Sequence, residues 1–177
     1  MRWSNKFMDD YYIEIDFDYP KKELLEYQLT INEWAPNLHY NKKGINTIED
    51  VKWFDHYPDF NSNLIFYELL SNIHLDIDTN VNPFKFVKTL KGGSLPYHID
   101  PIRECVLMLP LTDDNADLFW INNKSEVICK CTYKGPTVIN AKIMHGVPEN
   151  KSDRIFLQVN IPCDWKYLIN NYKDIFT

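Results

Sequence analysis

The sequence has little of what marks a secreted or membrane-spanning protein. Only four of its 177 residues are cysteine, and no two of them form a Cys-x-x-Cys pair. No run of about 18 apolar residues occurs, and the first residues lack the apolar core of a signal peptide. We therefore expect an intracellular, cytoplasmic protein whose cysteines (Cys105, Cys129, Cys131 and Cys163) are reduced thiols.

The chain also lacks an excess of basic residues. Its 19 Lys and Arg are outnumbered by 25 Asp and Glu, which gives a net charge of −6. General nucleic-acid binding requires a basic face, so we expect neither a nucleic acid nor a membrane as a partner. The acidic balance still permits a local basic pocket for an anionic small molecule. The sequence leaves the oligomeric state open.

Size and composition favour one folded domain. Hydrophobic residues make up 45% of the chain and aromatic residues 15%, which argues against disorder. We expect a single domain over 1–177. Within it we expect an N-terminal strand with supporting helices (1–83), a β core (84–163) and a C-terminal segment (164–177).

The first part of the chain reads as one strand and two helices. Apolar and polar residues alternate over 11–19, which predicts a half-buried strand. Helical spacing predicts helices over 21–34 and over about 62–73. Between them, the aromatic residues near Pro58 are expected to pack at a helix–loop junction, with a substrate-facing aromatic wall as the alternative; they are Trp53, Phe54, Tyr57 and Phe60.

From Phe84 onward the pattern changes to short strands separated by turns. Many short strands predict a sandwich or barrel, and the preceding helices should cover one sheet from outside. We expect a mainly β fold of the α+β kind. The predicted strands are 84–90, 97–100, 104–111, 118–121, 126–133, 137–140, 142–147 and 155–161, followed by a short closing helix within 164–176.

The last predicted strand has two unlike faces. Ile155, Leu157, Val159 and Ile161 share one face, whereas the other carries Arg154, Phe156, Gln158 and Asn160. The purely apolar face is expected to pack under the N-terminal helices, and the polar face with Arg154 to point into the interior of the β core.

The segment Tyr97–Arg103 carries the clearest chemical signal. His98 and Asp100 lie two residues apart on an extended segment, so they share a face and suit a divalent metal. His145, separated from Asp100 by 44 residues, is a candidate third ligand. Two histidines and one carboxylate with open coordination positions form the facial triad of non-haem Fe(II) oxygenases. The remaining histidines (His39, His56 and His74) have no such partner spacing.

This His98-x-Asp100, His145 and Arg154 pattern resembles the motif of Fe(II)- and 2-oxoglutarate-dependent dioxygenases. The resemblance implies a double-stranded β-helix, the jelly-roll or cupin-like fold, with N-terminal helices packed on one sheet. It also implies that His98, Asp100 and His145 bind Fe(II) as catalytic ligands, and that 2-oxoglutarate and O2 fill open positions. The implied reaction is hydroxylation of an unactivated C–H bond, with release of succinate and CO2.

The resemblance further implies that Arg154 binds the distal carboxylate of 2-oxoglutarate, for which a planar guanidinium is well suited. Many relatives carry a hydroxyl residue two places after this Arg. Here Phe156 stands there, so the helper hydrogen bond must come from elsewhere or be absent. Arg103 is a second candidate for an anionic cosubstrate or substrate. Its alternative role is an ion pair with Asp100 or Glu104.

Two other readings stay open. The spacing from Gly92 through His98, Asp100 and Glu104 also resembles a cupin motif. In that case Glu104 would join His98, Asp100 and His145 as a ligand of a different metal enzyme or of a small-ligand-binding module. The chain could instead be a pseudoenzyme that keeps only the fold. For the oxygenase reading, the expected substrate is a small molecule, an amino acid or a peptide side chain.

Overall fold

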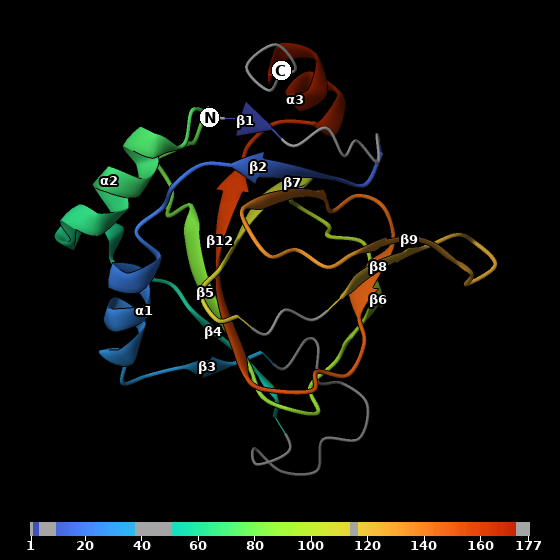
Figure 1. Cartoon of the computed structure of the whole chain (residues 1–177), viewed down its shortest axis with the longest axis horizontal. Coiled ribbons are helices and arrows are strands. Elements are labelled where there is room, and N and C mark those ends of the chain that lie inside the picture. The colour runs from blue at the N-terminus through green and yellow to red at the C-terminus, as the bar shows by residue number, and fades with distance from the viewer. Residues whose placement is uncertain (1, 4–9, 38–50, 114–116, 173–177) are drawn as a thin grey trace.

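The computed structural model describes residues 2–3, 10–37, 51–113 and 117–172, and these form a mainly β fold with three α-helices (Figure 1). All strand pairs are antiparallel and belong to two sheets. The large sheet has eight strands, in the order β1 (Arg2–Trp3), β2 (Tyr12–Asp16), β10 (Thr137–Asn140), β7 (Cys105–Pro110), β12 (Arg154–Ile161), β5 (Phe84–Thr89), β4 (Trp53–His56) and β3 (Ala35–Pro36). The small sheet has four, in the order β6 (Leu95–His98), β11 (His145–Val147), β8 (Leu118–Ile121) and β9 (Val127–Cys131).

The order of the strands is that of a jelly roll. From β5 to β12 the chain crosses repeatedly between the sheets, with β5, β7, β10 and β12 in the large sheet and β6, β8, β9 and β11 in the small one. This confirms the predicted double-stranded β-helix. Strands from the first 83 residues then extend the large sheet at both edges, with β2 beside β10 and β4 beside β5.

Two hydrophobic cores lie on opposite faces of the large sheet. One core joins Leu107, Leu157 and Val159 to the helices and contains no predicted site residue. The other lies between the sheets and includes Phe156 and Trp120. The two faces of β12 therefore separate as predicted: its apolar face packs under the helices, and the face with Arg154 points into the space between the sheets.

The helices cover the outer face of the large sheet (Figure 1). They are α1 (Lys21–Leu29), α2 (Leu64–Asn72) and α3 (Trp165–Tyr172), with a 3-10 turn, η2 (Phe60–Ser62), before α2. Asn63 caps α2, since its side chain accepts a hydrogen bond from the Ile65 amide at 3.0 Å. The closing helix α3 is confirmed, and the predicted residues after Tyr172 lie outside the described residues.

The first helix is shorter than predicted. It ends at Leu29, where Thr30 bonds back to the Tyr27 carbonyl through both its amide and its hydroxyl. Ile31 and Trp34, which suggested a helix through 34, still pack against the core from the segment after α1. The spacing of the apolar residues therefore predicted correctly that Ile31 and Trp34 pack against the core, but it predicted their secondary structure wrongly.

The prediction of a helix–loop junction at Trp53 and Phe54 is wrong. Residues 53–56 form β4, which pairs with β5 in the large sheet. The aromatic residues also separate: Trp53 faces the space between the sheets, whereas Phe60 packs in the core under the helices. An aromatic-rich segment beside a proline fits a strand as well as a junction, because aromatic side chains favour strands.

The strand β2 buries its apolar face, as predicted, and also one residue of its polar face. Ile13 and Ile15 enter the core under the helices, but Tyr12, expected on the polar side, stacks on Trp120 between the sheets with ring centroids 5.7 Å apart. Trp120 itself is fully buried.

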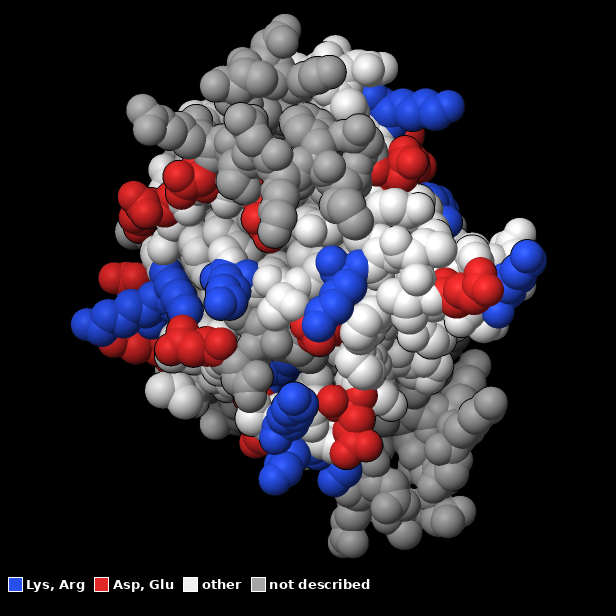
Figure 2. All heavy atoms as spheres, turned by 45° about the vertical axis from the view of Figure 1, so that its right-hand side comes forward, with Lys and Arg blue, Asp and Glu red and all other residues white. Residues whose placement is uncertain are grey.

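The distribution of charged side chains on the surface is consistent with the small net charge of the sequence, −6. On the face shown in Figure 2, basic and acidic side chains of the described residues are interspersed. The four cysteines are free thiols, three of them buried and Cys163 half-buried. Within the described ranges, no helix has the length and apolar character needed to cross a membrane.

Candidate metal centre and its chamber

His98, Asp100 and His145 come together at one end of the small sheet. Each offers one ligand atom, and these atoms all lie within 4.8 Å of one another. The pairing of β6 with β11 produces this arrangement, because His98 and His145 are direct cross-strand partners whose ring centroids lie 4.5 Å apart. Asp100 follows two residues after His98, at the turn beyond β6. The structure thus brings together the three residues that the motif predicts.

The backbone orients both imidazoles in the same way. Nδ1 of His98 lies 2.9 Å from the Pro96 carbonyl oxygen, and Nδ1 of His145 lies 2.8 Å from that of Ile143. A ring nitrogen bonded to a carbonyl oxygen carries the hydrogen, so Nε2 keeps the lone pair that a metal requires. Nε2 of His98 also lies 3.2 Å from Oδ1 of Asp100. Two acceptor atoms at this distance are well suited to a shared cation, which is the hydrogen-bonding proton in the metal-free protein and would be a divalent metal ion when one is bound.

The turn that carries Asp100 is fixed by several contacts. The Asp100 amide donates to the Ala141 carbonyl at 2.9 Å, and Nζ of Lys142 donates to the Pro101 carbonyl at 2.8 Å. Arg103 donates to Oδ2 of Asp100 at 2.6 Å, which leaves Oδ1 toward His98. Arg103 therefore has the ion pair with Asp100 that the sequence offered as an alternative, and not one with Glu104.

The electrostatics favour an ionised Asp100 and a neutral His145. Burial alone would raise the pKa of Asp100, but the hydrogen bond with His98 and the Arg103 charge lower it to about 2. Burial, followed by the nearby His98, lowers the pKa of His145 to about 4. A carboxylate beside a neutral imidazole is the protonation state that binds divalent metals.

The low pKa of His145 predicts how the chelator-treated protein responds to pH. The unfolded chain binds this proton near pH 6.5 and the folded chain only near pH 4, so stability is lost as the pH falls between these values. The loss is at most about 3 kcal/mol. Urea unfolding at pH 7 and pH 4.5 should show a smaller difference for His145→Gln than for the wild type. The exposed His74→Gln is the control, and an equal difference in all three proteins would contradict the assignment.

Arg154, the first residue of β12, is buried with only 3% of its surface exposed. Its guanidinium lies over the rings of Trp53 and Phe156, with its central carbon 5.6 and 4.9 Å from their centroids. Among the described residues no carboxylate forms an ion pair with it. A buried charge of this kind is costly unless an anion pairs with it.

Hydroxyl groups hold the guanidinium in place. Nε of Arg154 donates to Oγ1 of Thr89 at 3.0 Å, and one terminal nitrogen donates to the Tyr133 hydroxyl at 3.2 Å. Burial raises the pKa of Tyr133, an effect that the Arg154 charge partly offsets. Sequence reasoning missed both Thr89 and Tyr133. A hydroxyl does contact Arg154, but from β5 and from the loop after β9 rather than from the position of Phe156.

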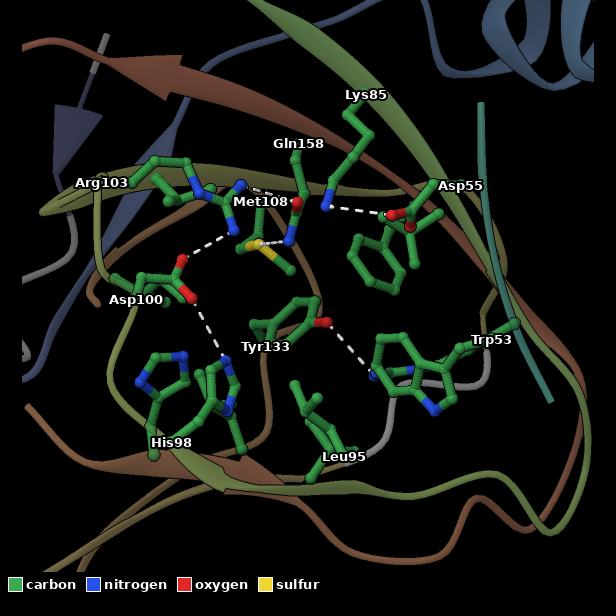
Figure 3. Close-up of a pocket in the computed structure, with 18 residues that line it drawn as sticks. Trp53, Asp55, Lys85, Leu95, His98, Asp100, Arg103, Met108, Tyr133 and Gln158 are labelled. Carbon is green, nitrogen blue, oxygen red and sulfur yellow. Dashed lines mark hydrogen bonds and ion pairs between the residues drawn. The ribbon is translucent and has the colours of Figure 1, made fainter. Parts of the chain in front are cut away.

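The triad and Arg154 line the same chamber between the sheets. Figure 3 shows this chamber, with His98, Asp100 and Tyr133 among the labelled residues. This inner chamber is narrow, at about 30 Å3, and it opens into an outer cleft of about 500 Å3. Six residues line both spaces: Asp55, Lys85, His98, Asp100, Arg103 and Gln158.

Glu104 does not join the cluster. Its Oε1 accepts a hydrogen bond from the Trp165 amide at 2.8 Å, which caps the first turn of α3. Of the other histidines, His56 lies 3.1 Å from the Glu33 carbonyl, His74 is exposed, and His39 lies outside the described residues. The cupin hypothesis, in which Glu104 is a fourth metal ligand, is therefore wrong about this residue.

Gly146 permits the close pairing of β6 and β11. A Cβ atom at this position would lie 2.8 Å from the Leu95 carbonyl oxygen and 2.9 Å from the Tyr97 ring. Any larger residue would push β11 away from β6 and separate His145 from His98.

Comparison with known proteins identifies the fold. No protein-family model and no curated sequence matches the chain. A solved structure of HygX from Streptomyces hygroscopicus, with nickel and 2-oxoglutarate bound, is similar over 84% of this chain and 81% of that one, with a TM-score of 0.52 and 10% identity. An oxidoreductase of the 2OG-Fe(II) oxygenase family from Burkholderia pseudomallei is similar over 79% and 76%, with a TM-score of 0.50 and 11% identity. At these identities the likeness establishes the shared jelly-roll fold.

Proposed function

We propose that this protein is an Fe(II)- and 2-oxoglutarate-dependent oxygenase that hydroxylates an unactivated C–H bond, with release of succinate and CO2. The observation that carries the proposal is that the His98, Asp100 and His145 cluster shares one chamber with the buried Arg154. Two histidines and a carboxylate suit Fe(II), and a buried guanidinium suits a carboxylate ligand. HygX, which has the same fold, holds nickel and 2-oxoglutarate.

In this proposal each residue has a defined task. His98, His145 and Oδ1 of Asp100 hold the metal, while Arg103 keeps Oδ2 of Asp100 turned away. Fe(II), with 2-oxoglutarate and O2, supplies the oxidising chemistry that converts a substrate C–H bond to C–OH.

Arg154 binds the distal carboxylate of 2-oxoglutarate through its planar fork. The Tyr133 hydroxyl accepts a hydrogen bond from Arg154, so its own hydrogen remains available to that carboxylate. Trp53 and Phe156 flank the guanidinium, keep water from it, and so strengthen the ion pair.

The narrow chamber must widen to admit the cosubstrate. Its volume of about 30 Å3 lies far below the roughly 300 Å3 at the lower end of ligand pockets. Side-chain rearrangement on binding is common, and Met108 in the chamber wall is the type of side chain that adapts most readily. We therefore expect 2-oxoglutarate binding to move side chains of the chamber and leave the sheets unchanged.

The first experiment is an anaerobic titration of the Fe(II)-loaded protein with 2-oxoglutarate. A visible charge-transfer band should grow and saturate, because 2-oxoglutarate chelates the metal. Succinate, which lacks the keto group, is the control and should give no band. Admission of O2 should then release succinate and CO2 from 2-oxoglutarate. If the protein shows no band and calorimetry detects no binding of 2-oxoglutarate, the oxygenase proposal is overturned. A metal site that does not use this cosubstrate is then favoured.

A further inference from the structure

The outer cleft leads directly to the metal cluster. Because its wall includes His98 and Asp100, a molecule bound in its volume of about 500 Å3 lies beside the site of the proposed chemistry. The volume is in the range of small-molecule sites and far above that of the inner chamber. The side chains of this wall therefore indicate the class of substrate that the protein accepts.

Two opposite charges lie side by side in the cleft wall. Nζ of Lys85 on β5 lies 3.6 Å from Oδ2 of Asp55 on β4, and their side chains are only 12% and 13% exposed (Figure 3). The distance is too long for a hydrogen bond, so the pair is loose. Burial lowers the pKa of Lys85, and Asp55 offsets this only in part. Oδ2 of Asp55 also accepts a hydrogen bond from Nδ2 of Asn37 at 2.7 Å. Both charges are thus nearly desolvated, and Asp55 only partly satisfies Lys85.

The hydrogen-bonding capacity around this pair is also incompletely used. Oδ1 of Asp55 is buried and has no hydrogen-bond partner among the described residues, and the same holds for Oδ1 of Asn160. Gln158 uses its oxygen to accept from Arg103, but its amide nitrogen contacts only the Met108 sulfur, at 3.6 Å. The wall therefore offers both acceptors and donors to a ligand.

Two large, exposed hydrophobic side chains lie at the mouth of the cleft. Tyr57 and Ile102 both line it, and they are 63% and 91% exposed, respectively. A ligand that reaches from Lys85 and Asp55 to the mouth thus meets charge at one end and hydrocarbon at the other. This combination suits a short molecule with a charged head and a carbon side chain.

We propose that the outer cleft binds a free α-amino acid as its zwitterion, with the carboxylate on Lys85 and the ammonium on Asp55. An α-amino acid carries its two charges on one carbon, so they are spaced as closely as those of Lys85 and Asp55. An anion alone would leave Asp55 unmatched beside it, and a cation alone would be repelled by Lys85. Each peptide bond removes one of the two charges, and an internal peptide residue, which has lost both, does not fit. The inference rests on the proposed function, because it names the substrate class of the same site.

The test is a calorimetric titration of the Zn(II)- and 2-oxoglutarate-loaded protein, which cannot turn over, with the common free α-amino acids. At least one should bind. Its N-acetyl and methyl ester derivatives should each bind at least about tenfold more weakly, since each loses a charged partner. If no free amino acid binds, or if both derivatives bind equally well, the inference fails. The same amino acids are titrated into metal-free protein in parallel. Binding there depends on Lys85 and Asp55 and not on the metal, so a failure of the proposed function is detected separately.

Matched variants distinguish recognition from structural support. Lys85→Met should abolish the preference for the free acid over its methyl ester, and Asp55→Asn the preference over the N-acetyl form. A purely structural role would leave these ratios unchanged. Lys88→Met is the control on the same strand, since Lys88 lies over the Trp34 ring and lines neither cavity.

The double variant Asp55→Lys/Lys85→Asp provides an independent test of the same inference. It keeps an ion pair but exchanges the two charges, so a structural role predicts restored amino-acid binding in the swapped protein. We expect the swapped protein to unfold at a temperature near that of the wild type and to bind the amino acid at least about tenfold more weakly. Wild-type affinity in the swapped protein would overturn the inference.

Discussion

Replacement of Arg154 by alanine is expected to weaken 2-oxoglutarate binding by roughly 30-fold to several thousand-fold. The loss of one partner of a buried, hydrogen-bonded charge pair typically costs about 2–5 kcal/mol. Arg154 has the features that place it in this range: it is buried, and no carboxylate of the described residues pairs with it. The measurement is the anaerobic titration of Fe(II) protein, with the visible band as the signal.

Two further variants make this result specific. Arg154→Lys should recover only part of the affinity, because an ammonium cannot reproduce two parallel hydrogen bonds in one plane. Tyr133→Phe should lose about 1.5–3 kcal/mol, or roughly 10- to 160-fold, as expected for one hydrogen bond to a charged group.

Lys88→Ala, which replaces a cation outside the chamber, is the control and should bind 2-oxoglutarate like the wild type. Fe(II) content should be unchanged in all of these variants, since none of the altered residues belongs to the triad. Wild-type 2-oxoglutarate affinity in Arg154→Ala would assign the cosubstrate carboxylate to another residue.

The pair of His98 and Asp100 was predictable because its geometry is encoded locally. Two ligands two residues apart share a face of any extended segment, and the strand-like runs around His98 and His145 made their pairing plausible. The faces of β12 were likewise predictable, because an alternation over eight residues gives strong period-two patterning. In both cases the sequence carries the signal within a few residues.

The supporting residues could not be predicted because they depend on long-range packing. Tyr133 contacts Arg154 from 21 positions away and Thr89 from 65, and neither has a spacing rule that relates it to Arg154. Asp55 was missed because β4 was read as a helix–loop junction, so the charges of Asp55 and Lys85 were never placed opposite each other. A hydroxyl residue at position 156 would have been predictable from the motif. The hydroxyls that contact Arg154 instead come from Thr89 and Tyr133 on other segments, and the sequence did not predict them.

Glu104 marks the limit of motif spacing alone. Its position four residues after Asp100 fitted a cupin ligand, yet its carboxylate caps α3 through the Trp165 amide. Beyond the turn at Pro101, the Glu104 side chain faces α3 and not the chamber that His98 and Asp100 line. Spacing rules hold along one strand and fail across such a turn.

Removal of a triad histidine is expected to have the largest effect on metal binding. His145→Ala deletes one of three ligands, and the metal affinity should fall by more than the roughly 10- to 100-fold that loss of an outer supporting partner typically costs. His98→Ala should behave alike. Fe(II)-dependent release of succinate should be abolished in both. His74→Ala removes an exposed histidine outside the cluster and should match the wild type.

Thermal unfolding with and without metal provides the measurement that separates lost binding from lost folding. A metal that binds only the folded state raises the unfolding temperature in proportion to the logarithm of its concentration over Kd. Wild type and His74→Ala should therefore be stabilised by Fe(II) under anaerobic conditions. His98→Ala and His145→Ala should unfold cooperatively but gain no stability from the metal. A variant that kept the full metal-induced shift and wild-type turnover would remove its histidine from the site.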